Sequence, residues 1–359
     1  MTTTTLQACR VHPRRWTVAM LIAAALAAPT PAQEPSAAEC VDRAARFLLS
    51  AQRSDGSIGD DGNRPVSSTS LALIALFSAG YPPTHPAHGA GILRAVDSIL
   101  DAHELPLERL HEDDRKIYGL SATLIALSFA CGELDDTARL ARVVRTSRRI
   151  IGLLNSAQTN RTGPAERGGW RYQIADADAD LSSTAWAVLA LEAAQAAGLP
   201  VEVERLEQAA LFALRCRTGP AAFHYQVNRN ERLSLAAAGL HVLIAGAALS
   251  SDDLRTALDQ LPAAVHTGDW PYISALHVSL LADRVGRGEA LPAWKAARLW
   301  LMQRQLEDGS FARNGRGDDT TAVIRTSFAS IALAAELHHV TWALPAPRWS
   351  DPPPRRQAP

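Results

Sequence analysis

The chain has 359 residues, of which 47% are hydrophobic and 6% aromatic, and its 36 basic and 37 acidic side chains leave a formal charge of −1. A charge so close to zero gives no electrostatic footprint for nucleic acid or for an anionic membrane surface. Few aromatic residues and a heavy use of Ala and Leu favour helices and disfavour a β-sandwich or barrel. A chain of this length can bury a core that stands without metal ions or disulfides.

Residues 1–33 have the pattern of an export signal. Arginines within residues 10–15 precede an apolar run that extends to about Ala28, and small, turn-forming residues follow it. This order is typical of a signal peptide, and the apolar run is too short for a membrane span. We therefore expect a periplasmic or secreted protein with no span in the mature chain, exported by the general secretory or the twin-arginine route.

Three stretches of the remaining chain repeat one pattern. An apolar helical stretch ends at a Gln, a glycine turn and one aromatic or Ile residue follow, and a Ser/Thr step opens a second stretch dense in Ala and Leu. A weaker copy runs from Leu206 to Gly246. The three copies of the turn are Gln52 with Asp55-Gly56-Ser57-Ile58, Gln158 with Gly168-Gly169-Trp170, and Gln305 with Asp308-Gly309-Ser310-Phe311.

The spacing of these turns predicts how many units the chain contains. A repeat length of about 50 residues fills the stretch from the turn at Gly56 to the turn at Gly309 and predicts six units in all. The two units without the glycine turn are expected at 93–131 and 254–285, where apolar residues still recur at helical spacing.

Each unit is expected to be a helical hairpin. The first helix is apolar on one face, whereas the second is apolar on nearly every face, which is typical of a buried helix. Ser and Thr at the start of the second helix can satisfy its free N–H groups. We therefore expect an outer ring of first helices and an inner ring of second helices. The inner ring would surround a central cavity that opens at the N-terminal ends of its helices.

The three turns resemble the Gln…Gly-x-Trp repeat signature of the squalene-cyclase and protein-prenyltransferase superfamily. The resemblance covers about residues 38–340 and implies an all-α fold, an (α/α) toroid of about six helical hairpins in two concentric rings. It implies no particular activity, because such repeats hold the fold together and function resides in sites grafted onto it. The tail at 344–359 is rich in proline, and we expect it to be disordered.

An acidic stretch before the third inner helix is the place where the resemblance puts catalysis. Class II cyclases of the superfamily protonate an alkene with an Asp-x-Asp-Asp motif, which Asp178-Ala179-Asp180 matches except that Leu181 replaces the last Asp. Closely spaced acids raise one another's pKa, as a general acid requires, so Asp178 and Asp180 are the candidate catalytic residues. The alternative is that they complement the positive N-terminus of the following helix. The low aromatic content argues against the aromatic-lined cavity that cyclases use to guide carbocations.

Polar and aromatic residues also gather beside the expected starts of the inner helices, where the mouth of a toroid would bind a ligand. Aromatic faces stack on sugars as well as on prenyl chains, so we expect a hydrophobic or a glycan ligand. We expect no cofactor and no metal ion, since the superfamily's zinc motif Asp-x-Cys is absent from the sequence. The candidate ligand contacts are Trp170, Arg171, Tyr172, Asp176, Asp318, Asp319 and Arg325.

Three functions agree with these features. The favoured one is an exported binding or scaffold protein without the chemistry of the superfamily. The second is an enzyme acting on a terpenoid or other hydrophobic substrate, with Asp178 or Asp180 as general acid. The third is a glycan-acting toroid such as a polysaccharide lyase, with Arg171 or Arg325 as base or charge stabiliser. The sequence leaves open whether the chain is an enzyme.

Overall fold

The computed structural model describes residues 35–59, 65–159, 163–264, 267–286, 291–314 and 320–337. The chain divides into two units, Met1–Ser36 and Ala37–Pro359, and every described helix and strand belongs to the second unit. The export signal expected at 1–33 and the disordered tail expected at 344–359 lie outside the described residues and stay predictions.

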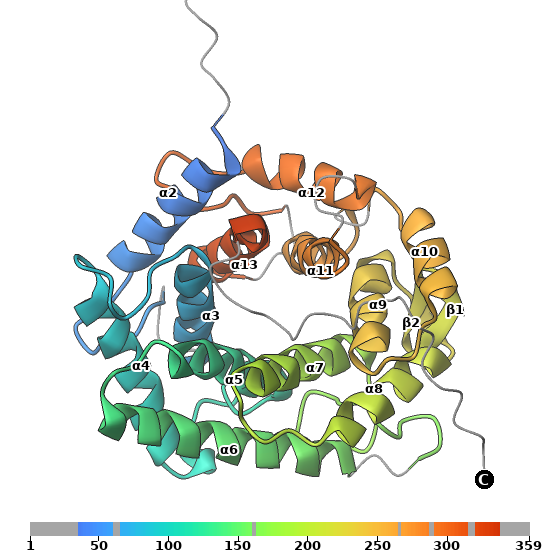
Figure 1. The fold of residues 1–359 in the computed structure, drawn as a ribbon, viewed down its shortest axis with the longest axis horizontal. Helices are drawn as coiled ribbons and strands as arrows, with labels where there is room; N and C mark the ends of the chain where they lie inside the picture. Colours follow the sequence, from blue (N-terminus) through green and yellow to red (C-terminus); the bar gives the residue numbers. More distant parts are fainter. Residues whose placement is uncertain are drawn as a thin grey trace, which may run out of the picture. The chain divides into compact units, whose positions relative to one another are not determined.

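Twelve α-helices in the described residues alternate between two concentric rings (Figure 1). This arrangement confirms the predicted (α/α) toroid, and the units expected at 93–131 and 254–285 are the hairpins α4–α5 and α10–α11. The outer helices are α2 (Ala37–Ser50), α4 (Gly89–Glu104), α6 (Thr137–Thr159), α8 (Val203–Cys216), α10 (Ser251–Asp259) and α12 (Pro292–Met302). The inner helices are α3 (Pro65–Ser78), α5 (Ile117–Cys131), α7 (Leu181–Ala196), α9 (Ala236–Ala245), α11 (Pro271–Arg284) and α13 (Ala322–Ala334). Short 3-10 turns η1 (Leu107–Arg109), η2 (Leu233–Leu235) and η5 (Ala335–Leu337) complete the helical elements.

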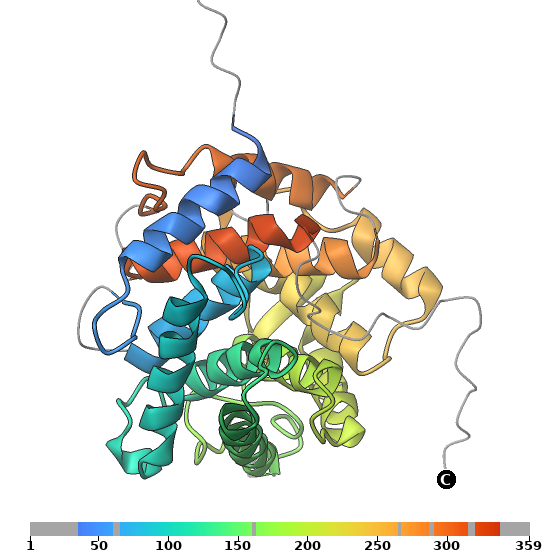
Figure 2. The same cartoon turned by 60° about the vertical axis from the view of Figure 1, so that its left-hand side comes forward.

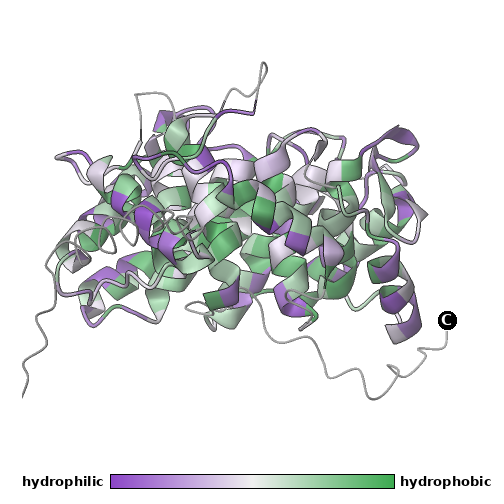
Figure 3. Cartoon of the chain, turned by 90° about the horizontal axis from the view of Figure 1, so that it is seen from above, coloured by the Kyte–Doolittle hydropathy of each residue, from purple (hydrophilic) through white to green (hydrophobic). Residues whose placement is uncertain are grey.

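The burial of the helices follows their hydrophobic patterns. Every residue of the inner helix α3 after Pro65 is buried, whereas the outer helix α2 buries one stripe at helical spacing. Figure 3, which shows the ring from its edge, has hydrophobic residues through the middle and hydrophilic ones on outer helices and loops. Among the described residues, no helix combines the length and apolarity that crossing a membrane demands.

The glycine turns depend on close packing between neighbouring hairpins. Gly56, Gly168 and Gly309 all have φ of +88°, a conformation that residues with a Cβ rarely adopt. A Cβ on Gly309 would also lie 2.3 Å from the carbonyl oxygen of Arg43 in α2. The corresponding distances to the next outer helix are 2.4 Å at Gly56 and 2.2 Å at Gly168. The repeat therefore requires glycine for two separate reasons, backbone conformation and space.

The glutamine of the repeat ties each turn to the next outer helix, and in the last hairpin this contact closes the ring. Gln305 Nε2 donates to the carbonyl oxygens of Gly309 at 3.1 Å and of Cys40 in α2 at 2.7 Å. Figure 2 shows α2 beside α13, as does Figure 1. The equivalent bonds run from Gln52 to Gly56 and Gly91 at 2.9 and 2.8 Å, and from Gln158 to Gly168 and Arg205 at 2.8 and 2.9 Å.

The fourth hairpin departs from the helix–turn–helix expectation. Between α8 and α9 the chain forms an antiparallel sheet in the order β1 (Arg217–Gly219), β2 (Ala222–Gln226) and β3 (Arg229–Glu231). Phe223 of β2 still fills the position of the repeat's aromatic residue, since it is fully buried and a Cβ on Gly239 of α9 would lie 2.7 Å from its ring. The sheet thus replaces the glycine turn without disturbing the helical pair.

The buried His103 of α4 is expected to make stability depend on pH. Burial, and secondarily the charge of Arg149, lowers the pKa of His103 to about 4. Between pH 6.5 and 4 the unfolded chain therefore binds a proton that the folded chain does not, so stability falls as the pH falls. Between pH 7 and pH 5 the unfolding free energy of the wild type should fall by about 2 kcal/mol more than that of His103→Leu, as measured by urea unfolding. The exposed His111, replaced by Leu, is the control. Equal pH dependence in the wild type and His103→Leu would contradict the assignment.

Candidate functional site: a cavity at the starts of the inner helices

A cavity of about 470 Å³ lies where the inner helices begin. Its volume is in the range of sites that bind one small molecule. Most of its lining comes from the first turns of the inner helices and the loops that lead into them. Ser67, Gly119, Ser182, Ser274 and Ile324 each lie in the first turn of an inner helix and line the cavity.

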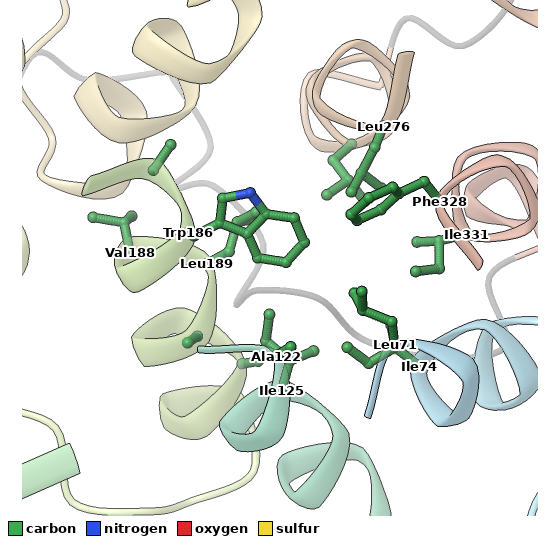
Figure 4. Packing of buried hydrophobic residues seen from close by; sticks show 14 of the residues in the cluster. Leu71, Ile74, Ala122, Ile125, Trp186, Val188, Leu189, Leu276, Phe328 and Ile331 are labelled. Atoms are coloured by element: carbon green, nitrogen blue, oxygen red, sulfur yellow. The ribbon is translucent and has the colours of Figure 1, made fainter. Parts of the chain in front are cut away.

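The base of the cavity is apolar. Trp186 and Phe328, both nearly fully buried, project from α7 and α13 toward the centre of the ring with their ring centroids 5.8 Å apart (Figure 4). Leu71 and Ala122 line the cavity beside them. Further along the same inner helices, buried residues such as Ile74, Ile125, Leu189 and Ile331 pack around the centre (Figure 4).

One wall of the cavity is aromatic from base to rim. The ring centroid of Tyr118 is 6.3 Å from that of Trp186 and 6.0 Å from that of Tyr172. At the rim, the hydroxyl oxygens of Tyr172 and Tyr225 are 2.6 Å apart. The expectation of a cavity poor in aromatic residues was wrong, because the fold gathers Tyr118, Tyr172, Trp186, Tyr225, Trp270 and Phe328 around this one space.

Arg171 holds the tyrosines of the rim together. Its guanidinium carbon lies 4.3 Å from the ring centroid of Tyr172 and 5.5 Å from that of Tyr225, within cation–π range. Arg171 Nη1 also donates to the Tyr225 hydroxyl at 2.8 Å. Burial raises the pKa of Tyr225, so its hydroxyl stays protonated. The rim therefore presents fixed aromatic faces with hydroxyl groups between them.

Trp270 is a strained and exposed part of the rim. Its side chain lines the cavity with 52% of the residue exposed, and its φ of +58° is in the left-handed region. A bulky residue in this conformation costs of order 1 kcal/mol or more, and such strain is concentrated at functional sites. Pro271 follows at the first position of α11 and fixes where that helix begins.

Asp180, a candidate catalytic residue, caps α7. It is fully buried, and its oxygens accept from the Ser183 N–H at 2.8 Å, the Ser183 hydroxyl at 2.9 Å and Arg171 Nη1 at 2.9 Å. Burial raises the pKa of Asp180, although the bonds from Ser183 and Arg171 act in the opposite direction. Asp180 is not among the described residues that line the cavity, so its role as general acid stays a prediction.

Asp178 lies outside the lining too, but closer to solvent. Its side chain is half-exposed, with Oδ2 3.3 Å from Arg171 Nε and 3.1 Å from Gln226 Nε2. It therefore flanks the arginine that organises the rim, and its catalytic role stays a prediction as well.

The structure brings two of the seven candidate ligand contacts, Arg171 and Tyr172, to the cavity. Trp170 is instead fully buried, and its indole N–H donates to the Leu154 carbonyl at 2.8 Å. It occupies the position of the aromatic or Ile residue that follows each glycine turn of the repeat. Asp176 accepts the Gln173 N–H at 2.7 Å and closes a turn.

Arg325 also serves the framework rather than the lining. It is buried, and its Nε donates to the Phe311 carbonyl at 3.2 Å while Nη1 donates to the Thr320 carbonyl, which holds the loop before α13. Asp318 and Asp319 lie outside the described residues, so their expected role stays a prediction.

Sequence reasoning missed several lining residues, among them Tyr118, Tyr225, Arg232 and Trp270. Trp270-Pro271 carried a usable signal, because Pro marks the start of a helix and the start of an inner helix faces the cavity. Tyr225 carried none, since it reaches the rim from the unexpected strand β2.

No protein-family model and no curated protein matches the chain. Several solved structures, however, match the chain in fold. The GH76A alpha-1,6-mannanase from Salegentibacter sp. HEL1_6 aligns with a TM-score of 0.59 at 10% identity over 84% of this chain and 99% of that one. An inactive variant in complex with alpha-1,6-mannotriose gives 0.57 at the same identity and coverage. The type II terpene cyclase MstE from Scytonema, bound to geranylgeranyl dihydroxybenzoate, gives 0.49 at 13% identity over 84% and 96% of the two chains. At such low identity the likeness to the mannanase shows a shared (α/α) toroid fold and nothing further.

Proposed function

We propose that this chain is a binding protein whose toroid holds one small amphiphilic ligand, with an apolar body against the aromatic wall and a polar part at the rim. The observation that carries the proposal is the cavity of about 470 Å³, which joins an apolar base to an aromatic and polar rim. Mostly apolar pockets with a few placed polar groups are typical of small-molecule sites.

The carboxylate groups that line the cavity support ligand binding rather than acid–base catalysis. Among the described residues that line the cavity, Asp113 is the one carboxylate, and it lies 2.9 Å from Lys116 Nζ in an ion pair. Glycoside hydrolysis uses two carboxyl groups that flank the scissile bond. The described lining therefore supplies a binding surface more readily than an acid and a base.

A second candidate function is an enzyme acting on a glycan or a terpenoid at the rim. The observation that favours it is the half-exposed Asp178 beside Arg171, near the exposed aromatic face of Tyr172. In this candidate Asp178 or Asp180 protonates the substrate. Incubation with mannan or with farnesol would then yield a product, and its formation would be abolished by Asp178→Asn if Asp178 is the acid and by Asp180→Asn if Asp180 is the acid.

Titration with anilinonaphthalene sulfonate, which pairs an apolar body with an anionic group, tests the binding function. The wild type should bind the probe with enhanced fluorescence, and Tyr172→Ala and Trp270→Ala should each weaken binding roughly tenfold, as loss of an aromatic anchor does. Leu211→Ala is the matched control, because Leu211 is 46% exposed on the outer helix α8 and does not line the cavity. Absent binding, or equal loss in all three variants, would refute the proposal.

A further inference from the structure

Three Lys and Arg side chains of the described residues line the cavity, and two of them have close carboxylate partners. Lys116 Nζ lies 2.9 Å from Asp113 Oδ1. Arg171 Nη1 lies 2.9 Å from Oδ2 of the fully buried Asp180. Arg232 is the third, and its side chain is 35% exposed. Lys116 and Arg171 therefore offer a ligand little unbalanced charge.

Arg232 uses little of its hydrogen-bonding capacity. Its Nη1 donates to Asp269 Oδ2 at 2.8 Å, and Asp269 is the one acceptor that its side chain reaches among the described residues. A guanidinium carries five N–H donors, so four remain. The side chain of Asp269 is 68% exposed, and such a surface ion pair adds little to stability. A ligand can therefore bind the remaining donors, or replace Asp269, at small cost.

The fold fixes Arg232 beside the aromatic part of the rim. Its backbone N–H donates to the Phe223 carbonyl at 3.1 Å. Its guanidinium carbon lies 5.1 Å from the ring centroid of Tyr225, within cation–π range. Stacking on an aromatic face holds a guanidinium in place and leaves the N–H groups at its edge free to donate. Leu235 and Ile273 line the same cavity, so a positive charge and apolar surface are available to one ligand.

The chemistry of the guanidinium determines which head groups fit it. It can only donate hydrogen bonds, and its paired N–H groups match the two oxygens of a carboxylate. An alcohol offers one uncharged oxygen, and a cationic head group would be repelled by the basic side chains of the lining. A phosphate carries nearly two charges, and the second would find Lys116 and Arg171 already paired.

We propose that Arg232 is the anchor for an anionic head group, so that the ligand is an amphiphile with a single carboxylate-like charge, such as a long-chain acid. The inference rests on the proposed binding function and narrows the polar part of its ligand to one anion. The head group binds the free edge of the guanidinium, and the apolar body lies against the aromatic wall. Arg232 thereby determines specificity for the charge, whereas Tyr172 and Trp270 supply affinity for any apolar body.

Isothermal titration calorimetry with octanoate and octanol at about pH 7.5 tests this inference, because the two compounds share one carbon chain and differ in the head group. The wild type should bind octanoate at least about tenfold more tightly than octanol, since charge-assisted hydrogen bonds are stronger than neutral ones. Arg232→Gln should bring that ratio to about one or below, mainly by weakening octanoate. Arg255→Gln, which breaks a surface ion pair with Asp252 away from the cavity, is the matched control and should keep the ratio.

Asp269→Asn gives a readout that a damaged fold would not produce. Removal of the competing carboxylate frees the whole guanidinium of Arg232, so octanoate should bind about two- to fivefold more tightly, the factor that corresponds to an exposed ion pair. The affinity for octanol should stay unchanged. Octyl phosphate should bind the wild type no more tightly than octanoate, because one accessible cation balances one charge.

Equal affinity for octanoate and octanol in the wild type would overturn the inference, as would a tenfold preference that persists in Arg232→Gln. Weaker binding of octanoate to Asp269→Asn, or tenfold tighter binding of octyl phosphate than of octanoate, would overturn it as well. The wild-type comparisons need no variant to fold. If anilinonaphthalene sulfonate does not bind to the wild type, the proposed function fails; if it binds and octanoate is not preferred to octanol, the inference alone fails.

Discussion

Gly309→Ala is expected to destabilise the protein far more than a glycine replacement at the same backbone conformation elsewhere. Two penalties add at this position. An alanine at φ of +88° costs about 1–2 kcal/mol. Its Cβ would also meet the Arg43 carbonyl at 2.3 Å, and the displacement of α2 that relieves this contact costs about a further 1–3 kcal/mol. The two penalties together amount to about 2–5 kcal/mol, to be measured by urea unfolding.

Gly198→Ala is the matched control for this prediction. Gly198 has φ of +77°, and a Cβ there would meet no atom within 4 Å, so it carries the conformational penalty without the steric one. The difference between the two variants isolates the contact between the last and the first hairpin. Equal destabilisation by Gly309→Ala and Gly198→Ala would mean that the ring is not closed by packing at this turn.

Asp180→Ala is expected to be the most destabilising change in the acidic stretch. It removes the cap of α7 and leaves Arg171 without the partner that lies 2.9 Å from it in the interior. Loss of a helix cap costs about 0.5–2 kcal/mol and loss of a fully buried ion pair about 3–5 kcal/mol; because Arg171 is partly exposed and keeps Asp178 as a partner, we expect a total cost of about 2–3 kcal/mol. The rim should loosen at the same time, since Arg171 also orients Tyr172 and Tyr225, so binding of anilinonaphthalene sulfonate should weaken.

Asp178→Ala is the control that tests whether burial of the carboxylate, and not its charge alone, determines the loss of stability. Asp178 also pairs with Arg171, at 3.3 Å, but its side chain is 50% exposed. An exposed ion pair contributes about 0–1 kcal/mol, so this variant should remain close to the wild type in stability. If both variants left the unfolding free energy unchanged and only Asp180→Ala lost a catalytic activity, Asp180 would be a general acid rather than a cap.

The sequence predicted the architecture because the fold is built from a repeated local rule. Apolar faces, the Gln and glycine of each turn and the Ser/Thr helix starts are all short-range signals, and the contacts of Gln305 and Gly309 follow from them. The pattern also placed the cavity at the starts of the inner helices.

The site was predictable only in part, for a physical reason. The cavity lining comes from loops and helix starts far apart in the chain, and adjacency in sequence says little about which of these side chains turn inward. Trp170 and Tyr172 are two positions apart, yet the first is a buried wedge and the second is on the rim. Tyr225 depends on β2, a five-residue strand in a hairpin that the repeat pattern predicted to be a simple turn.

Mass spectrometry of the small molecules that the folded protein retains when it is purified from its native source tests the central claim most directly. We expect one compound per chain, with an apolar body and a polar part, which is depleted in the rim variant Trp270→Ala and kept in Leu211→Ala. Recovery of no compound from the wild type, or of a glycan fragment in its place, would contradict the account.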